Sequence, residues 1–444
     1  MAAPRPRLVV ALARCALVAA ALATAPAFAA QGLKQLYEAA RGYDASWLAA
    51  RALADSAPYK AAQSEALARP SATLAGSVDH AQIDDPAVGV GGQNSSQLAL
   101  NASVPLFNRA NRATIERARR AEEMAGFDLE SAEQDLIVRV AQAYFGVLAA
   151  RDSLDAQRTG VKAITEQLAS ARRNFEVGSA TITDTREAQA RYDLARAQQL
   201  AAENELRTRQ VTLDQLVGRS RVEPEPLAPG AVLAAPLPAD AEAWVAAADG
   251  AHPAIRKARL ALEMARLETE KARAGRLPTL DAVGSVGVGD SHGVATTIPG
   301  RLTTASIGVQ LNWPLYDGGA LQNRIGEALA LEDKARHDLQ GARRAVEQAT
   351  RVAFLALQSG LAQVKALEAA ESSSRLALEA TQLGYQVGVR VNLDVLNAQT
   401  QLYTTQRDLA RSRYDALVDG LRLRQAAGEL RASDLDAIDA LLVH

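Results

Sequence analysis

Four short segments of the chain alternate apolar and polar residues with a period of two. The clearest are 96–104 and 305–313, and weaker versions run over 71–79 and 279–289. This period is typical of β-strands with one apolar and one polar face. Each segment has about 9–11 residues, the length that a tilted strand needs to cross a bilayer. A half-buried strand of a soluble sandwich fits the alternation equally well, because barrel strands give a weak signal per segment.

Gly-, Asp- and Ser-rich loops are expected between the paired strands, at 80–95 and 290–301. The longer segments that follow have a helical pattern. Apolar residues recur every seven positions over 140–175 and, in the same phase, over 357–385, with a break at Glu371. A seven-residue period indicates helices that wrap as a coiled coil. The first such helix is expected to have about 65 residues and a length of roughly 100 Å.

The two helical regions are copies of one another. FEVG at 175–178 matches YQVG at 385–388, and a constant offset of 210 residues (388 − 178) continues without a gap into the next helix. An internal repeat of this kind predicts a duplicated structural unit. Gly178 and Gly388 are expected at the turns between two antiparallel helices, where a left-handed residue closes the first helix.

These patterns divide the chain into two similar halves. Each half is expected to run helix, strand, strand, long helix, turn, long helix. The predicted divisions are 1–29 for a signal peptide, 30–218 for the first repeat with a β-hairpin at about 71–105, 219–250 for a Pro-rich linker or equatorial region, 251–430 for the second repeat with a β-hairpin at about 279–314, and 431–444 for a short C-terminal tail.

The N-terminus has the pattern of a secretory signal. Arg5 and Arg7 precede a short apolar run at 8–23, and the AFA motif at 27–29 supplies the small residues of a cleavage site. The brevity of the apolar run and the cleavage motif favour this interpretation over a transmembrane anchor. Cleavage after residue 29 removes three arginines and no acids, so the formal net charge changes from −2 to −5. This balance does not favour nucleic acid as a partner.

The sequence offers no convincing catalytic constellation, metal site or cofactor site. The only cysteine, Cys15, lies inside the predicted signal. Gly287 and Gly289 lie in a strand and loop and do not precede a helix, so they do not favour phosphate binding. The five histidines are scattered without ligand spacing, at 80, 252, 292, 337 and 444. We therefore expect neither an enzyme nor a metalloprotein.

Four strands in one chain leave a sheet with open edges, which cannot lie in lipid. If these strands span a membrane, several chains must share one barrel: two copies would give eight strands and three would give twelve. The polar inner face would line a water-filled lumen. The long helices would continue the barrel as a coiled-coil tube on one side of the membrane.

Several motifs resemble those of a known family. They are VPLF at 104–107, WPLYDGG at 313–319, LPTL at 277–280, and the two tip segments 174–193 and 384–403. Across nearly the whole mature length the chain resembles the TolC family of outer-membrane export ducts. The resemblance implies a homotrimer with a twelve-stranded outer-membrane β-barrel and a long periplasmic α-helical barrel. It also implies contact with outer-membrane lipid, a periplasmic adaptor, and an inner-membrane ABC or RND transporter.

The resemblance also assigns a gate to the helix tips. It maps the side-chain ties that close the duct onto Asp184, Tyr385 and Arg390. An Asp–Arg pair can form two charge-assisted hydrogen bonds, and a tyrosine hydroxyl can add a third. The spacing of Asp184 and Glu187 also fits a capping box with Asp184 as the N-cap. Capping and gating do not exclude one another.

A constriction next to the gate is implied in the same way. Asp394 matches one of two acidic rings of the family, whereas Asn397 departs from the acid of the other. Asp394 also has a simpler interpretation, as a first-turn residue that complements the helix dipole. One ring in place of two predicts weaker block by multivalent cations, and Asn397→Asp is expected to strengthen that block.

The favoured function is therefore the exit duct of a tripartite export system for type I secreted proteins, small-molecule efflux substrates or both. A structural or adhesive coiled-coil protein of the envelope is the alternative. The four barrel-type strands argue against it, because such a protein does not need them.

Overall fold

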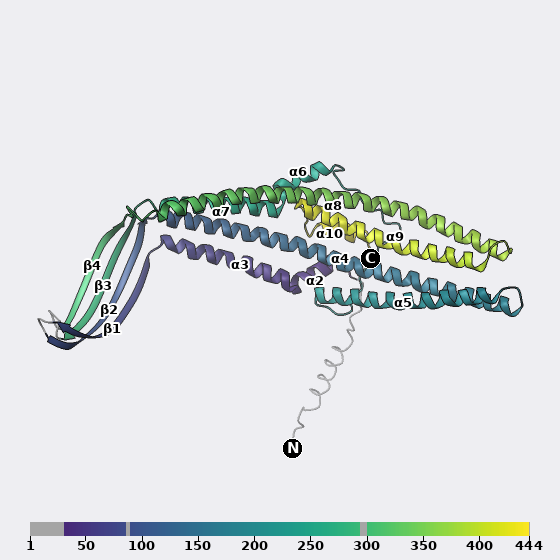
Figure 1. Cartoon of the computed structure of the whole chain (residues 1–444), viewed down its shortest axis with the longest axis horizontal. Helices are drawn as coiled ribbons and strands as arrows, with labels where there is room; N and C mark the ends of the chain where they lie inside the picture. Colours follow the sequence, from purple (N-terminus) through teal and green to yellow (C-terminus); the bar gives the residue numbers. More distant parts are fainter. Residues whose placement is uncertain (1–30, 86–88, 294–299, 444) are drawn as a thin grey trace, which may run out of the picture.

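The computed structural model describes residues 31–85, 89–293 and 300–443; the predicted signal peptide, including Cys15, lies outside these ranges. The molecule is long and narrow, with a β-sheet at one end and the tips of two helical hairpins at the other (Figure 1). The other helices lie beside the hairpins, and α3 (Ala45–Glu65) and α7 (Pro253–Ala274) run from the middle of the molecule toward the sheet (Figure 1).

The sheet contains both predicted strand pairs, in the antiparallel order β1-β2-β3-β4. Its strands are β1 (Ser71–Asp85), β2 (Gly89–Phe107), β3 (Thr279–Gly293) and β4 (Gly300–Asn312). They have 13–19 residues and extend into most of the expected loops at 80–95 and 290–301, so those loops were predicted too long. The Gly-, Ser- and Gln-rich ends have weak strand preference of their own, and pairing with neighbouring strands fixes them.

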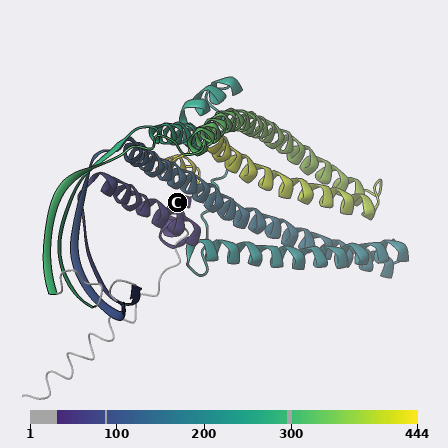
Figure 2. The ribbon, with the colours of Figure 1, turned by 60° about the vertical axis from the view of Figure 1, so that its left-hand side comes forward.

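The strand register gives the sheet two different faces, because directly paired residues project to the same side. One apolar row across the sheet is Leu74, Leu100, Val286 and Ala305. The adjacent polar row is Thr73, Asn101, Ser285 and Ser306. The side chains of Leu74, Leu100 and Val286 are 68%, 50% and 55% exposed, and no helix covers the sheet (Figure 2). The apolar face is thus open to the surroundings of the chain.

The helices form two long hairpins with short helices beside them. The hairpins are α4 (Arg109–Glu176) with α5 (Ile182–Val217), and α8 (Ala320–Gln386) with α9 (Asn392–Ala427). The others are α2 (Leu33–Tyr43), α3 (Ala45–Glu65), η1 (Ala66–Ala68), α6 (Ala241–Ala251), α7 (Pro253–Ala274) and α10 (Asp434–Asp439). Helix α4 packs against α9 as well as α5, which joins the hairpins side by side.

Every helix in the described ranges is too short or too polar to span a bilayer.

The seven-residue pattern marks the buried seam of each hairpin. In α4, Val140, Val147 and Leu154 are all buried. The break at Glu371 in α8 has a local explanation, because its carboxylate accepts hydrogen bonds from Gln406 of α9 and from Arg375. The bond from Gln406 is the main cause that lowers the pKa of Glu371. At the position of Glu371, hydrogen bonds therefore replace apolar packing between α8 and α9.

The main hydrophobic core lies where α2, α4, α5, α9 and α10 meet. Phe145 stacks on Tyr414 with ring centroids 5.7 Å apart. The Tyr414 hydroxyl donates to Asp152 at 2.7 Å, and burial raises the pKa of that carboxyl group. The repeat-related glycines that follow α5 and α9 also have left-handed backbones, and a Cβ at Gly218 would lie 2.3 Å from the Tyr43 ring. This pair of glycines lets the short helices approach the ends of both hairpins.

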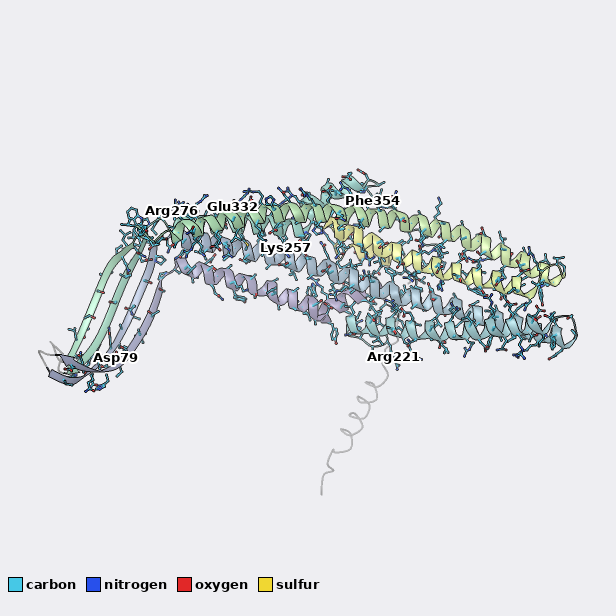
Figure 3. All side chains as sticks on the ribbon, viewed as in Figure 1. Asp79, Arg221, Lys257, Arg276, Glu332 and Phe354 are labelled. Carbon is cyan, nitrogen blue, oxygen red and sulfur yellow. The ribbon has the colours of Figure 1, made fainter. Side chains whose placement is uncertain are left out.

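Two regions contain more helix than the sequence predicted. Helix α6 lies inside the expected Pro-rich linker, where Asp240 caps it and Trp244 is buried beside Phe354 and Leu423; Figure 3 labels Phe354 on α8. The prolines of the linker end before this alanine-rich stretch, which therefore keeps its helix preference. In the expected tail, α10 is joined to α2 through Asp439, which accepts from the backbone N–H of Leu33 at 2.8 Å.

Candidate functional site

The two hairpin tips close with the same backbone geometry. Gly178 and Gly388 have φ values of +78° and +80°, as the left-handed turn prediction requires. In the first tip, the N–H groups of residues 179 and 180 donate to the carbonyl of Asn174, at 2.8 and 3.1 Å. In the second tip, those of residues 389 and 390 donate to the carbonyl of Gly384, at 2.9 and 3.1 Å. The repeat therefore extends to individual hydrogen bonds.

The first tip has a complete helix cap. Thr181 is the N-cap of α5, and its hydroxyl oxygen accepts from the N–H of Asp184 at 3.2 Å. The Asp184 carboxylate accepts from the N–H of Thr181 at 2.9 Å and from its hydroxyl at 2.8 Å. Asp184 is therefore the third helical residue of a capping box, and the prediction that it is the N-cap was wrong. The Thr-x-x-Asp spacing at 181–184 contained the correct signal three residues earlier.

The second tip has only half of that cap. Val391 is the N-cap of α9 and has no side-chain acceptor, so the N–H of Asp394 receives no cap from that side chain. The Asp394 carboxylate accepts from the N–H of Val391 at 3.4 Å and lies 3.7 Å from the guanidinium of Arg390. Asp394 lies in the first turn of α9, where a carboxylate is stabilised by the helix dipole.

Within one chain the three predicted gate residues do not meet as a group. Asp184 caps its own helix, and Arg390 forms an ion pair with Asp394 in the same tip. Tyr385 alone reaches the other hairpin, where its hydroxyl accepts from the side-chain amide of Asn174 at 3.1 Å. The assignment of these residues to a gate stays a prediction.

Three polar side-chain pairs join the two hairpins near the tips. Besides Asn174–Tyr385, they are Gln167–Asn392 and Arg191–Asn397. Sequence reasoning missed Gln167, Asn174, Arg191 and Asn392. A signal was available, because Tyr385 and Asn392 replace Phe175 and Ile182 of the first copy. A polar residue that replaces an apolar repeat partner marks a contact that the other copy does not make.

The predicted constriction residues have different charge partners. Asp394 is opposed by Arg390, as described. The side-chain oxygen of Asn397, one turn further along α9, accepts from the guanidinium of Arg191 at 3.1 Å. An amide does not neutralise a guanidinium, and Arg191 forms no ion pair with any carboxylate in the described ranges. The level of Asn397 therefore carries a positive charge that the sequence prediction did not include.

Three exposed valines give the second tip an apolar end. Val387, Val389 and Val391 are 66%, 75% and 57% exposed. In the first copy their counterparts are Val177, Ser179 and Thr181, so only one of the three is apolar there. The two tips thus expose different apolar residues, since the first tip exposes Phe175, Val177 and Ile182.

Comparisons with known proteins cover most of the chain. A family model described as outer membrane efflux protein matches residues 36–219 and 244–429. The outer membrane protein TolC of Vibrio cholerae is 30% identical over 428 residues, which are 95% of this chain and 97% of that protein. The alkaline protease secretion protein AprF of Pseudomonas aeruginosa is 36% identical over 316 residues, which are 70% and 65% of the two chains.

A solved structure has the same fold. The outer membrane protein VceC of Vibrio cholerae superposes with a TM-score of 0.77 at 21% identity, over 89% of this chain and 96% of that one. At this identity the likeness concerns the fold alone.

Proposed function

The chain belongs to the outer membrane efflux protein family, and from that premise we propose that it is the exit duct of a tripartite export system. It lies in the outer membrane with a periplasmic extension, and it passes substrates from an inner-membrane transporter to the exterior. One observation carries this function. A four-stranded sheet with one exposed apolar face stands at the end of two helical hairpins. A sheet of this kind is typical of a membrane β-barrel, in which one face contacts lipid and the other contacts water.

We propose that three copies close one barrel. In a single sheet β1 and β4 are both edges, and unpaired edges are not tolerated in lipid. Three copies would supply twelve strands, with the row of Leu74 and Leu100 toward lipid and the row of Thr73 and Asn101 toward the lumen. Helix α4 has 68 residues and so a length of about 100 Å. Three pairs of hairpins would therefore extend the duct far into the periplasm.

The tips are the proposed docking end. The exposed valines of the second tip support contact with a periplasmic adaptor, because a group of apolar side chains on a helix end favours burial by a partner. The inner-membrane component would be an ABC or RND transporter. The duct itself performs no covalent chemistry in this proposal and requires no cofactor.

The gate and the constriction also remain proposals. Asp184, Tyr385 and Arg390 would hold the closed state, with the partners of Asp184 and Arg390 supplied when three chains assemble. Asp394 and Asn397 would line the narrowest level. The position of all five residues within the last turns at one end of the hairpins supports this assignment.

The relatives indicate two classes of cargo. AprF and the PrtF protein of Dickeya chrysanthemi are named for protease secretion, whereas BepC of Brucella suis is named as an outer membrane efflux protein. The identity to AprF, 36%, supports type I protein secretion as one use of this duct. Use by a drug pump is the second candidate.

Reconstitution tests the proposal with a matched pair of variants. Leu100 and Asn101 are neighbours on β2 with opposite faces. Arginine on the lipid face of a barrel costs about 2–4 kcal/mol near the midplane. We expect Leu100→Arg to abolish insertion and Asn101→Arg to insert and change conductance. The readouts are native mass and conductance in planar bilayers. A protein that stays monomeric and forms no channel, or equal tolerance of both substitutions, would contradict an exit duct.

A further inference from the structure

Four arginines line one cavity where the sheet joins the helices. The cavity has a volume of about 600 Å³ and lies between the start of α4 and the end of α7. Arg109 and Arg112 come from α4, whereas Arg273 and Arg276 come from the end of α7 and the turn that leads to β3. Figure 3 labels Arg276 at this corner. We refer to this space as the junction cavity.

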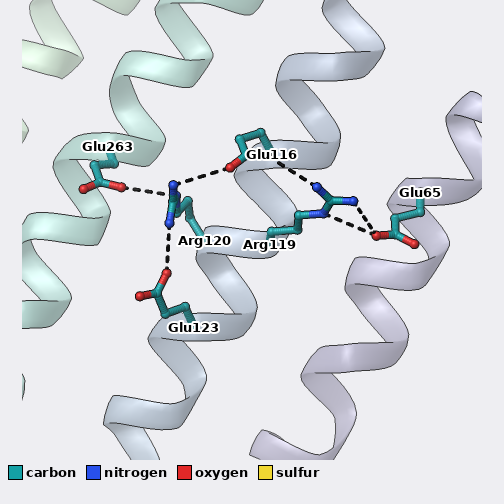
Figure 4. Close-up of polar contacts among 6 residues, drawn as sticks. All are labelled: Glu65, Glu116, Arg119, Arg120, Glu123 and Glu263. Carbon is teal, nitrogen blue, oxygen red and sulfur yellow. Dashed lines mark hydrogen bonds and ion pairs between the residues drawn. The ribbon is translucent and has the colours of Figure 1, made fainter.

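The arginines just beyond the cavity have carboxylate partners. Figure 4 shows Arg119 between Glu65 and Glu116, and Arg120 among Glu116, Glu123 and Glu263. These ion pairs, at 2.9–3.7 Å, join α3, α4 and α7. At this level the helices are thus held together by ion pairs.

The arginines of the junction cavity differ from these in their charge partners. None of the four forms an ion pair with a carboxylate in the ranges that the structure describes, and Arg276 donates only to the neutral amide of Gln322. The lining includes two acids, but Glu116 is already shared by Arg119 and Arg120. Glu270 alone faces four guanidinium groups. The cavity therefore has an excess of positive charge, and two of its arginines lie in the first turns of α4, where the helix dipole disfavours cations.

Exposed aromatic side chains place this cavity at the membrane surface. Phe107, Trp313 and Tyr316 lie at the same corner and are 45%, 56% and 91% exposed. The chain is only 4% aromatic, so three exposed rings at one level are informative. Such rings are typical of the interface between lipid headgroups and hydrocarbon. The helices extend from here into the periplasm, so the corner lies at the periplasmic leaflet.

An apolar surface adjoins the arginines. A second cavity is lined by Leu106 and Phe107 and shares Arg109 and Arg112 with the first. Leu106 is 55% exposed. A molecule with a negative headgroup and an acyl chain would match both parts.

We propose that the junction cavity binds the phosphate group of an anionic glycerophospholipid from the periplasmic leaflet of the outer membrane. The guanidinium groups hold the phosphate in bidentate hydrogen bonds, which arginine forms with tetrahedral oxyanions. The acyl chains lie along Leu106 and Phe107. The bound lipid fixes the depth and angle at which α4 and α7 leave the membrane. This inference rests on the proposed function only for the position of the corner in the membrane.

The strength of the site can be estimated from its charges. A basic side chain near an anionic membrane surface contributes about 1 kcal/mol, or about fivefold in affinity. Loss of two arginines, one from each side of the cavity, is therefore expected to weaken lipid binding about 25-fold. Lysines at the same positions keep the charge but not the bidentate geometry, so their effect should be intermediate.

Native mass spectrometry of the assembled full-length protein tests this inference. The probes are phosphatidylglycerol and phosphatidylcholine with identical acyl chains, each titrated from detergent. The junction variant is Arg112→Gln with Arg273→Gln, and Arg112→Lys with Arg273→Lys is the conservative variant. The control is Arg207→Gln with Arg344→Gln, which removes from α5 and α8 two exposed arginines that form no ion pair in the described part of the chain. We expect phosphatidylglycerol to bind the parent and the control alike, and the junction variant about 25-fold more weakly.

Three results would overturn the lipid site. They are equal binding of the two lipids by the parent, equal binding of phosphatidylglycerol by the junction variant and the control, and displacement of the lipid by millimolar inorganic phosphate alone. Conductance of the same samples in bilayers separates this outcome from a failure of the exit duct. Normal channels without selective lipid binding reject the site alone, whereas absent channels reject the function.

Discussion

The first and second hairpin tips have the same backbone but are held in different ways. The first is closed by its own side chains, through the reciprocal bonds of Thr181 and Asp184. The second has valine at the cap position and instead contacts the first hairpin through Tyr385, Asn392 and Asn397. The duplicated tips thus share the glycine turn but differ in the side-chain contacts that hold them. The first tip has a helix cap made by its own side chains, and the second tip lacks a side-chain acceptor at its N-cap.

This difference leaves the second tip less restrained by its own side chains, which agrees with our proposal that a docking partner moves the second hairpin. Breaking the cross-hairpin contacts leaves the first tip with its cap intact, whereas the second tip loses most of its side-chain restraints. Restraints of this kind are individually weak, since exposed ion pairs are worth about 0–1 kcal/mol. In the proposed assembly of three chains they would act together, as the proposed gate, closed at rest and opened by contact, requires.

The largest expected effect comes from breaking the gate ties. Arg390→Ala and Asp184→Ala should each raise the basal conductance of the closed channel in planar bilayers about tenfold, because three ties of about 0.5 kcal/mol are lost at once. Arg186→Ala is the matched control, since Arg186 is an exposed arginine of the first tip without an ion pair in the described ranges. If both variants stay as closed as the parent, the gate lies elsewhere.

A second experiment changes the charge at Asn397. Asn397→Asp alone should strengthen block by divalent or trivalent cations only slightly, because Arg191 would pair with the new carboxylate. With Arg191→Gln added, block should strengthen about fivefold or more, since one unit-charge contact at 4 Å is worth about 1 kcal/mol in water. The measurement is the blocking concentration in single-channel recordings. If Asn397→Asp alone strengthens cation block fivefold, Arg191 does not offset the charge at position 397.

Exchanging the caps tests the comparison directly. Thr181→Val should destabilise the first turn of α5 by about 1 kcal/mol, and Val391→Thr should stabilise the first turn of α9 by a similar amount. Amide hydrogen exchange at the two tips measures both changes. We expect exchange to become faster at the first tip and slower at the second. A change in the same direction in both variants would contradict the difference between the two caps.

The smallest expected effect comes from a single hydroxyl group. Tyr385→Phe removes the acceptor for Asn174 but keeps the ring, which should cost about 0.5–1 kcal/mol in contact between the hairpins. This bond lies within one chain and does not itself hold the three chains of the proposed gate together. Basal conductance should therefore rise only about twofold to fivefold, less than for Arg390→Ala. Phe175→Tyr is the control, because it adds a hydroxyl at the repeat-related position. A larger rise in basal conductance for Tyr385→Phe than for Arg390→Ala would show that the Asn174–Tyr385 contact contributes more to closure than the contacts of Arg390.

Much of the architecture could be predicted because it depends on local periodicity. The strands follow from a two-residue period of apolar residues, and the long helices follow from a seven-residue period. The two turns follow from glycine, which readily adopts a positive φ. Each of these signals depends on residues that are close together in the chain. The ends of the elements were less predictable. Strands β1 and β2 continue through residues with weak strand preference, and α6 forms in a range that prolines had marked as irregular.

The candidate site was only partly predictable. The glycine turns at the repeated motifs could be read from the sequence. The partners of Asp184, Tyr385 and Asn397 could not, because each contact depends on which residue of another helix lies opposite. Arg191 is 206 residues from Asn397 in the chain, and their spacing carries no sequence signal.

The sequence by itself determined the duplication, the two-sided strands, the helical hairpins and their glycine turns. These features depend on short-range sterics and on the period of apolar residues. The tertiary structure alone decided that β2 pairs with β3 and aligns the apolar row across both halves. It also decided that Thr181 caps the first tip, that Arg191 contacts Asn397, and that one cavity is lined by four arginines that form no ion pair among the residues that the structure describes. Such contacts join residues far apart in the chain, and their energy depends on the packed geometry in which they meet.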